Sequence, residues 1–173
     1  MKAKQALRGG EGPLVFSSAF YLAPQDDIEG PLLDLVAQAK RSILIEIYGF
    51  ALPSLTDALI AAKQRGVEVK ILFDHTQACG VKERELVKRI AEAGIEHWVG
   101  TSPRHAIRHS KFMIVDEEIS EHGSYNYSKS AKDQNNTVEI TRSRDRAAKL
   151  IADFYFNRAW IQQNEPQYNT PAV

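Results

Sequence analysis

Strand-like and helix-like segments alternate through the first hundred residues, and this alternation constrains the fold more than any other feature of the sequence. The strand-like segments, rich in β-branched and apolar residues, are 14–17, 42–50 (SILIEIYGF), 67–73 (VEVKILF) and 95–99. Between them, apolar side chains recur at helical spacing after Pro31, after a capping sequence that begins at Ser54, and within 81–93. Such alternation is typical of βαβ units in an α/β layered sheet.

The pattern changes in the second half of the chain. Residues 111–116 and 137–141 have strand-like sequences with a short polar segment between them, and Ser143 caps a final helix. We therefore predict an α/β fold with a mixed, largely parallel β-sheet flanked by helices on both faces.

The length of 173 residues fits one domain of ordinary size. We predict a flexible lead over 1–12, a single domain over 13–162 and a polar tail over 163–173. Hydrophobic residues make up 43% and charged residues 25%, which excludes a disordered chain, a collagen-like fibre and a coiled coil. The single cysteine, Cys79, excludes an internal disulfide and a multi-cysteine zinc module.

Charge and hydropathy limit the possible partners. The 22 basic residues balance 22 acidic ones, so a globally basic nucleic-acid-binding protein is excluded while a local basic patch is not. No apolar run reaches the roughly 18 residues that span a bilayer, so we expect no membrane anchor. The first 12 residues carry positive charge without a following apolar segment, which favours a cytoplasmic location; a signal peptide already removed would leave no trace.

Residues suited to phosphodiester chemistry gather in one stretch, RHSKFMIVDEEISEHGSYNYS. His109 and Lys111 are two residues apart, so on a strand they point to the same face. An imidazole is a nucleophile near neutral pH without a metal, and a lysine supplies charge for phosphate oxygens. Gly123 lets the backbone approach a ligand, and Ser124 and Asn126 add neutral donors. Together these groups can stabilise a five-coordinate phosphorus transition state.

The spacing of these residues resembles the signature of the phospholipase D superfamily: His-x-Lys, four residues, Asp, six residues, Gly-Ser, and an Asn two residues on. The matching residues are His109, Lys111, Asp116, Gly123, Ser124 and Asn126. The resemblance extends through ILIEIYGF, ALIAAKQRG and VEVKILFD and covers roughly Leu14 to Trp160.

The motif occurs once, which resembles the small single-motif bacterial nucleases that pair two subunits. The resemblance implies a homodimer in which one His109 attacks phosphorus to form a phosphohistidine and the other protonates the leaving oxygen. Lys111 and Asn126 of both subunits would hold the phosphate, and Asp116 would be the motif's acid, which fixes the local fold. No cluster of His, Cys and carboxylates has ligand spacing, so we expect no metal and no cofactor.

One position departs from the family pattern. Family members often carry an acid followed by Asn about ten residues after the Gly-Ser, and that acid orients the imidazole. This chain has Asn135-Asn136 there, so the candidates for orienting His109 are Asn135 and Glu46, with Asp133 and Glu139 behind them. Glu46 is a lone charge in an apolar strand and should be paired if it is buried.

Basic side chains precede the motif. Arg104, His105 and Arg108 lie close to Lys111 with no acid among them, and they can bind nucleic-acid phosphates. The alternative is an ordinary loop with some positive charge.

These features predict a metal-independent phosphodiesterase that cleaves DNA, RNA or both at a site shared across a homodimer. One alternative is a lipid phosphodiesterase or phosphatidyl transferase. The other is a nucleic-acid-binding protein with an impaired site, which Asn135 favours.

Overall fold

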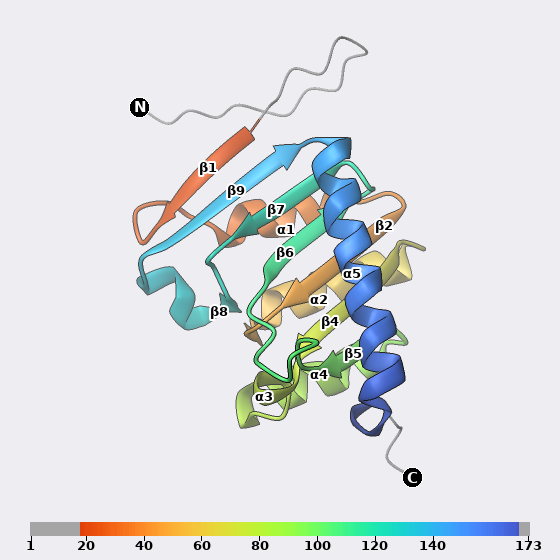
Figure 1. Ribbon diagram of the computed structural model, residues 1–173. Helices are drawn as coiled ribbons and strands as arrows, with labels where there is room; N and C mark the ends of the chain where they lie inside the picture. The colour runs from red at the N-terminus through yellow and green to blue at the C-terminus, as the bar shows by residue number, and fades with distance from the viewer. Residues whose placement is uncertain (1–17, 170–173) are drawn as a thin grey trace.

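A seven-stranded mixed sheet runs through the middle of the molecule in the computed structural model, which describes residues 18–169 (Figure 1). In spatial order its strands are β1 (Ser18–Ala23), β9 (Asn136–Arg142), β7 (Ile119–Gly123), β6 (Lys111–Val115), β2 (Ser42–Ile47), β4 (Glu68–Asp74) and β5 (Glu96–Gly100). A small second sheet pairs β3 (Phe50–Ala51) with β8 (Tyr127–Ser128). The helices are α1 (Glu29–Gln38), α2 (Pro53–Gln64), α3 (His75–Ala78), α4 (Val81–Glu92) and α5 (Arg144–Asn164), with 3-10 turns η1 (Lys129–Asp133) and η2 (Pro166–Tyr168).

The prediction of a mixed α/β sheet with helices on both faces is confirmed, but the sheet contains less parallel pairing than predicted. Among the described strands, β2–β4 and β4–β5 are parallel. The pairs β1–β9, β2–β6, β6–β7 and β7–β9 are antiparallel. The short turn between β6 and β7 accounts for their antiparallel pairing, because parallel neighbours need a crossover of a dozen or more residues.

Each face of the sheet buries its own apolar cluster. The larger cluster joins the inward sides of α1, α2 and α4 to one face, through residues such as Leu32, Leu59 and Ile90. On the other face α5 runs diagonally across the strands, and Phe154 and Ile161 pack on Leu44, Leu72 and Phe112 (Figure 1). Helices on both faces explain why β2 is a nearly continuous apolar run.

Several boundaries differ from the sequence predictions. The helix predicted after a Ser54 cap begins at Pro53, with Leu52 at the N-cap, and the Ser54 hydroxyl donates to Glu29 instead. Proline suits this first helical position because the backbone N–H that it lacks would have had no hydrogen-bond partner within the helix. Ser143 does cap α5, and its Oγ accepts from the amide of Arg146 at 3.3 Å.

Strands β1, β7 and β8 were not predicted. The strand expected over 14–17 and the flexible lead over 1–12 lie outside the described residues, and the first described strand is β1. The segment between 116 and 137, predicted to be a short polar connection, contains β7. Its sequence, ISEHG, lacks the apolar content of a core strand, yet Ser120 and Glu121 are both buried.

Residues 163–169, which belong to the predicted polar tail, contain the end of α5 and the turn η2. Helix α5 continues to Asn164, and Glu165 is buried. The Glu165 carboxylate accepts from the amide of Thr101 at 2.7 Å and from its hydroxyl at 2.6 Å. These bonds fasten the end of α5 to the loop that leads toward His109.

Candidate active site

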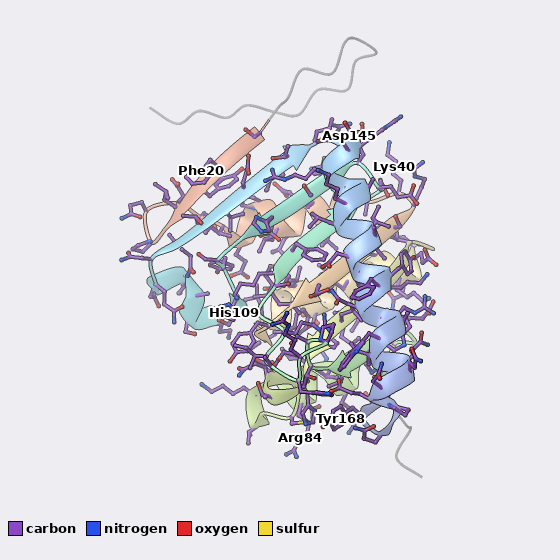
Figure 2. All side chains as sticks on the ribbon, viewed as in Figure 1. Phe20, Lys40, Arg84, His109, Asp145 and Tyr168 are labelled. Atoms are coloured by element: carbon purple, nitrogen blue, oxygen red, sulfur yellow. The ribbon has the colours of Figure 1, made fainter. Side chains whose placement is uncertain are left out.

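The signature residues come together at one edge of the sheet, where β2, β4 and β7 end and β6 begins. His109 lies just before β6, and Figure 2 shows it at the lower end of the sheet in that view. Pairing of Ile47 with Lys111 places the carboxyl end of β2 beside the start of β6. Asn126 follows β7 and precedes β8. Segments as far apart in sequence as Gly49 and Asn126, 77 residues, therefore build one cluster.

His109 and Lys111 lie against Tyr48, the residue that follows β2. The Tyr48 and His109 rings meet edge to face with centroids 4.9 Å apart, and the Lys111 Nζ lies 5.3 Å from the Tyr48 ring centroid. Lys111 is buried, and its Nζ donates to the His109 carbonyl at 2.8 Å. Burial lowers the pKa of Lys111. The His109 imidazole is exposed, and neither ring nitrogen hydrogen-bonds within residues 18–169.

Asn126 is held in place by the turn after β2. Its Oδ1 accepts from the amide of Gly49 at 3.2 Å, and the Tyr127 amide donates to the Gly49 carbonyl at 2.9 Å. A Cβ on Gly49 would lie only 3.1 Å from Asn126, so the small residue allows this close approach. The Asn126 Nδ2 donates to no described residue, which leaves it available to an external acceptor.

The sequence analysis predicted that Gly123 and Ser124 contact a ligand, but in the structure both residues support the local fold. A Cβ on Gly123 would lie 2.0 Å from the Thr137 carbonyl oxygen, so glycine is required by the contact between β7 and β9. The Ser124 hydroxyl donates to Asn136 Oδ1 at 2.9 Å and accepts from the Thr137 amide at 3.0 Å. Its single proton is therefore already in use.

Asp116 lies at the opposite end of β6 from Lys111, which contradicts a catalytic place for it and agrees with the structural role that the resemblance implies. Its carboxylate accepts from the amides of Lys40, Arg41 and Ser42 at 2.7–3.2 Å. Burial alone would raise the pKa of Asp116, but these amide hydrogen bonds lower it below its usual value. Figure 2 shows Lys40 at the far end of the sheet from His109.

Arg108 and Glu46 form a buried ion pair, which corrects both of their predicted roles. Arg108 is 3% exposed and Glu46 is 1% exposed, and Nη1 of Arg108 lies 3.0 Å from Oε1 of Glu46. Burial raises the pKa of Glu46, and the guanidinium opposes that rise. Asn157 of α5 donates to the other carboxylate oxygen at 3.1 Å. Arg108 therefore does not face a substrate, and Glu46 holds Arg108 and not the imidazole.

The same loop is fastened by Asp74 at the end of β4. Asp74 caps α3 by accepting from Thr76 and Gln77, and its Oδ2 accepts from the Arg108 amide at 2.6 Å. The Arg108 Nη2 donates to the Thr101 carbonyl at 2.6 Å. Hydrogen bonds of the Arg108 amide and of the Arg108 side chain thus fix the backbone immediately before His109.

Arg104 and His105 lie at the surface. Both are exposed, and the His105 ring lies edge to face on Trp160 with its Nδ1 3.7 Å from the buried Glu165 carboxylate. Asn135, one of the candidates for orienting His109, is exposed, and its neighbour Asn136 is buried and accepts a hydrogen bond from Ser124.

Sequence reasoning missed Tyr48 and Gln77. Gln77 donates to the Tyr48 hydroxyl at 2.9 Å and so extends the cluster to α3. A signal was present, because Tyr48 lies near the carboxyl end of the strand predicted over 42–50 and Gln77 lies four residues beyond the strand predicted over 67–73, at the edge where α/β sheets bind ligands. Within residues 18–169, no group of three or more His, Cys, Asp or Glu side chains is arranged to hold a metal, and no helix is long and apolar enough to cross a bilayer.

Comparison with known proteins identifies the class to which this fold and site belong. A family model described as cardiolipin synthase, PLD-like domain, matches residues 32–160. The chain belongs to the phospholipase D superfamily.

Named relatives and solved structures agree with this assignment. A phospholipase D of Rickettsia bellii is 34% identical over 76% of this chain, and the mitochondrial cardiolipin hydrolase of Xenopus tropicalis is 27% identical over 80% of it. The chain spans about three fifths of the length of these relatives, 61% and 63%. The crystal structure of Nuc, a phospholipase D family member from Salmonella typhimurium, superposes with a TM-score of 0.78 at 28% identity, covering 84% of this chain and 96% of that one.

Proposed function

We propose that this protein is a metal-independent phosphodiesterase that cleaves nucleic acid with His109 as the nucleophile. The observation that carries the proposal is the cluster of an exposed imidazole, a buried lysine with two N–H groups to spare and an asparagine Nδ2 without an internal partner. These groups supply a nucleophile and donors for the oxygens of a phosphodiester.

The reaction proceeds in two displacements. A nitrogen of His109 attacks phosphorus, the N–P bond forms, and the P–O bond to the leaving group breaks. The leaving oxygen takes a proton from an imidazolium, which becomes neutral. Water then attacks phosphorus, gives its proton to that imidazole, and the N–P bond breaks. Lys111 and Asn126 neutralise and bind the phosphate oxygens throughout.

The second imidazole comes from His109 of the partner subunit in a two-fold homodimer. Two observations support this: His109 is exposed, and neither of its nitrogens has a partner within the described chain. An isologous interface places the same residue opposite itself. Mixing the wild type with an excess of His109→Ala subunits should then suppress activity far beyond simple dilution, since mixed dimers hold one imidazole. A monomer in light scattering with full specific activity would contradict the shared site.

Nucleic acid is the proposed substrate because the exposed side chain of Arg104 adds positive charge to the loop that leads to His109. A second candidate is a lipid phosphodiester, which the names of the relatives favour: phospholipase D and mitochondrial cardiolipin hydrolase.

The test is hydrolysis of labelled single-stranded DNA, RNA and phosphatidylcholine in parallel, in the presence of EDTA. We expect cleavage of nucleic acid by the wild type and a loss of roughly 10³-fold or more in His109→Ala. His122→Ala is the matched control, because His122 is an exposed histidine on β7 outside the cluster. Cleavage of the lipid alone would support the second candidate, and binding without cleavage over a full pH range would support an impaired site.

A further inference from the structure

A cavity of about 380 Å³ opens beside the proposed catalytic cluster. Tyr48 and Asn126 contribute to both the cavity and the cluster, so a group attached to the scissile phosphate can reach into it. A second cavity, of about 460 Å³, is lined by residues such as Ser18, Glu139 and Arg146 and shares no residue with the cluster.

Apolar surface and hydrogen-bonding side chains both line the cavity beside the cluster. The hydrogen-bonding side chains are Gln77 of α3, Glu83 of α4, and Asn126, Ser128, Ser130 and Gln134 from the segment around β8 and η1. Lys82, which is exposed, also contributes. An acyl chain in this cavity would cover the buried Glu83 carboxyl without offering it a donor, at a cost of roughly 1–3 kcal/mol. A planar group with donors and acceptors on its edge offers such a donor.

Glu83 is the unusual member of this lining. It is 8% exposed, and its carboxyl accepts a hydrogen bond from the Phe50 backbone but forms no ion pair with any described residue. A carboxyl oxygen accepts a hydrogen bond in either protonation state. The free acceptor capacity of a buried carboxyl fits a ligand that brings a donor.

We propose that this cavity binds the nucleobase next to the scissile phosphate, and that Glu83 accepts a hydrogen bond from the exocyclic amino group of that base. This inference rests on the proposed function, since it names the part of a nucleic-acid substrate that the site selects. Carboxylates accept from the N4 amino group of cytosine, whereas the corresponding atom of thymine or uracil is itself an acceptor. The site therefore prefers amino-bearing bases.

The experiment compares cleavage of single-stranded oligo(dC) and oligo(dU) of equal length, which differ at this position of the base. We expect the wild type to show a kcat/KM for oligo(dC) higher by on the order of tenfold. In Glu83→Gln the ratio of the two values should fall toward one, because an amide both donates and accepts. This ratio does not depend on the amount of folded enzyme.

Glu85→Gln is the matched control, because it removes the same charge from an exposed position on the same helix. It should keep the preference of the wild type. Gln134→Ala, at an exposed lining residue, gives a second test and should raise KM for oligo(dC). Equal cleavage of both oligonucleotides by the wild type, or an unchanged ratio in Glu83→Gln, would overturn the proposal. Hydrolysis of bis(4-nitrophenyl) phosphate without cleavage of either oligonucleotide would instead overturn the nuclease function itself.

Discussion

The polar side chains of the signature divide into those that remain available to a substrate and those that the fold uses. His109, Lys111 and Asn126 retain free nitrogens or N–H groups at the surface of the cluster. Asp116 and Ser124 already form hydrogen bonds with backbone and side-chain partners within the chain. Substitutions in the two sets should therefore separate loss of activity from loss of stability.

Asp116→Asn should lower the free energy of unfolding at pH 7 by about 1–3 kcal/mol, because three amides lose a charged acceptor. Since the pKa of Asp116 is lowered in the folded state, its stabilising effect is complete above its unfolded pKa and disappears as the pH falls through the folded pKa. Urea unfolding across acidic buffers should thus show the two proteins converge. Glu117→Gln, at an exposed neighbour, is the control; equal stability of Asp116→Asn and this control at pH 7 would contradict the prediction.

At the scale of elements, the site depends on how closely strands β7 and β9 approach each other. The Gly123 Cα faces the Thr137 carbonyl so closely that any Cβ would clash. The same two strands position Ser124, whose bonds to Asn136 and Thr137 shape the turn that leads to Asn126. The distance between β7 and β9 thus determines the position of Asn126, which we propose binds the phosphate.

Gly123→Ala should destabilise the protein by about 1–3 kcal/mol, because the strands must separate to admit the methyl group. Activity per folded molecule should also fall, since the turn carrying Asn126 would shift. Thermal unfolding and hydrolysis of bis(4-nitrophenyl) phosphate measure the two effects. Gly30→Ala is the control: its nearest neighbour is the end of the exposed Asp27 side chain, which can move away. A melting temperature as high as that of the control would refute the requirement.

Local patterns predicted most elements, and long-range contacts account for the differences. Apolar periodicity located α1, α2, α4 and α5, and β-branched runs located β2 and β4. Strand β7 was missed because its buried carboxylate, Glu121, reads as a surface residue until Tyr127 is brought beside it. Likewise, the signature spacing identified His109 and Lys111, but nothing local indicated that Arg108 would turn inward to Glu46, 62 residues away.

At the scale of the whole molecule, one buried acid makes stability depend on pH. Glu121 is enclosed in the larger core, where Tyr127 donates to one carboxyl oxygen and the other has no hydrogen bond. Burial raises the pKa of Glu121 to about 8, although the Tyr127 hydrogen bond opposes the rise. The folded protein therefore keeps this proton at neutral pH, whereas the unfolded chain releases it.

The free energy of unfolding should fall as the pH rises from the unfolded pKa of Glu121, near 4.5, to the folded value of about 8, and then level off. The loss amounts to roughly 1.4 kcal/mol for each unit by which the pKa is raised. Glu121→Gln mimics the protonated acid and should remove most of this dependence. Urea unfolding at several pH values measures it, with Glu85→Gln as the control at an exposed site. Parallel curves for the wild type and Glu121→Gln would refute the assignment.

The contacts of Asp116 give the spacing of the signature a geometric meaning. From Lys111 to Asp116 the chain crosses the sheet once, a span of about 17 Å at the rise of a β-strand. One inserted residue would turn the carboxylate to the opposite face, and two would carry it past the amides of residues 40–42. The number of residues between the lysine and the aspartate is therefore set by the length of strand β6, and not by the chemistry of the site at its start.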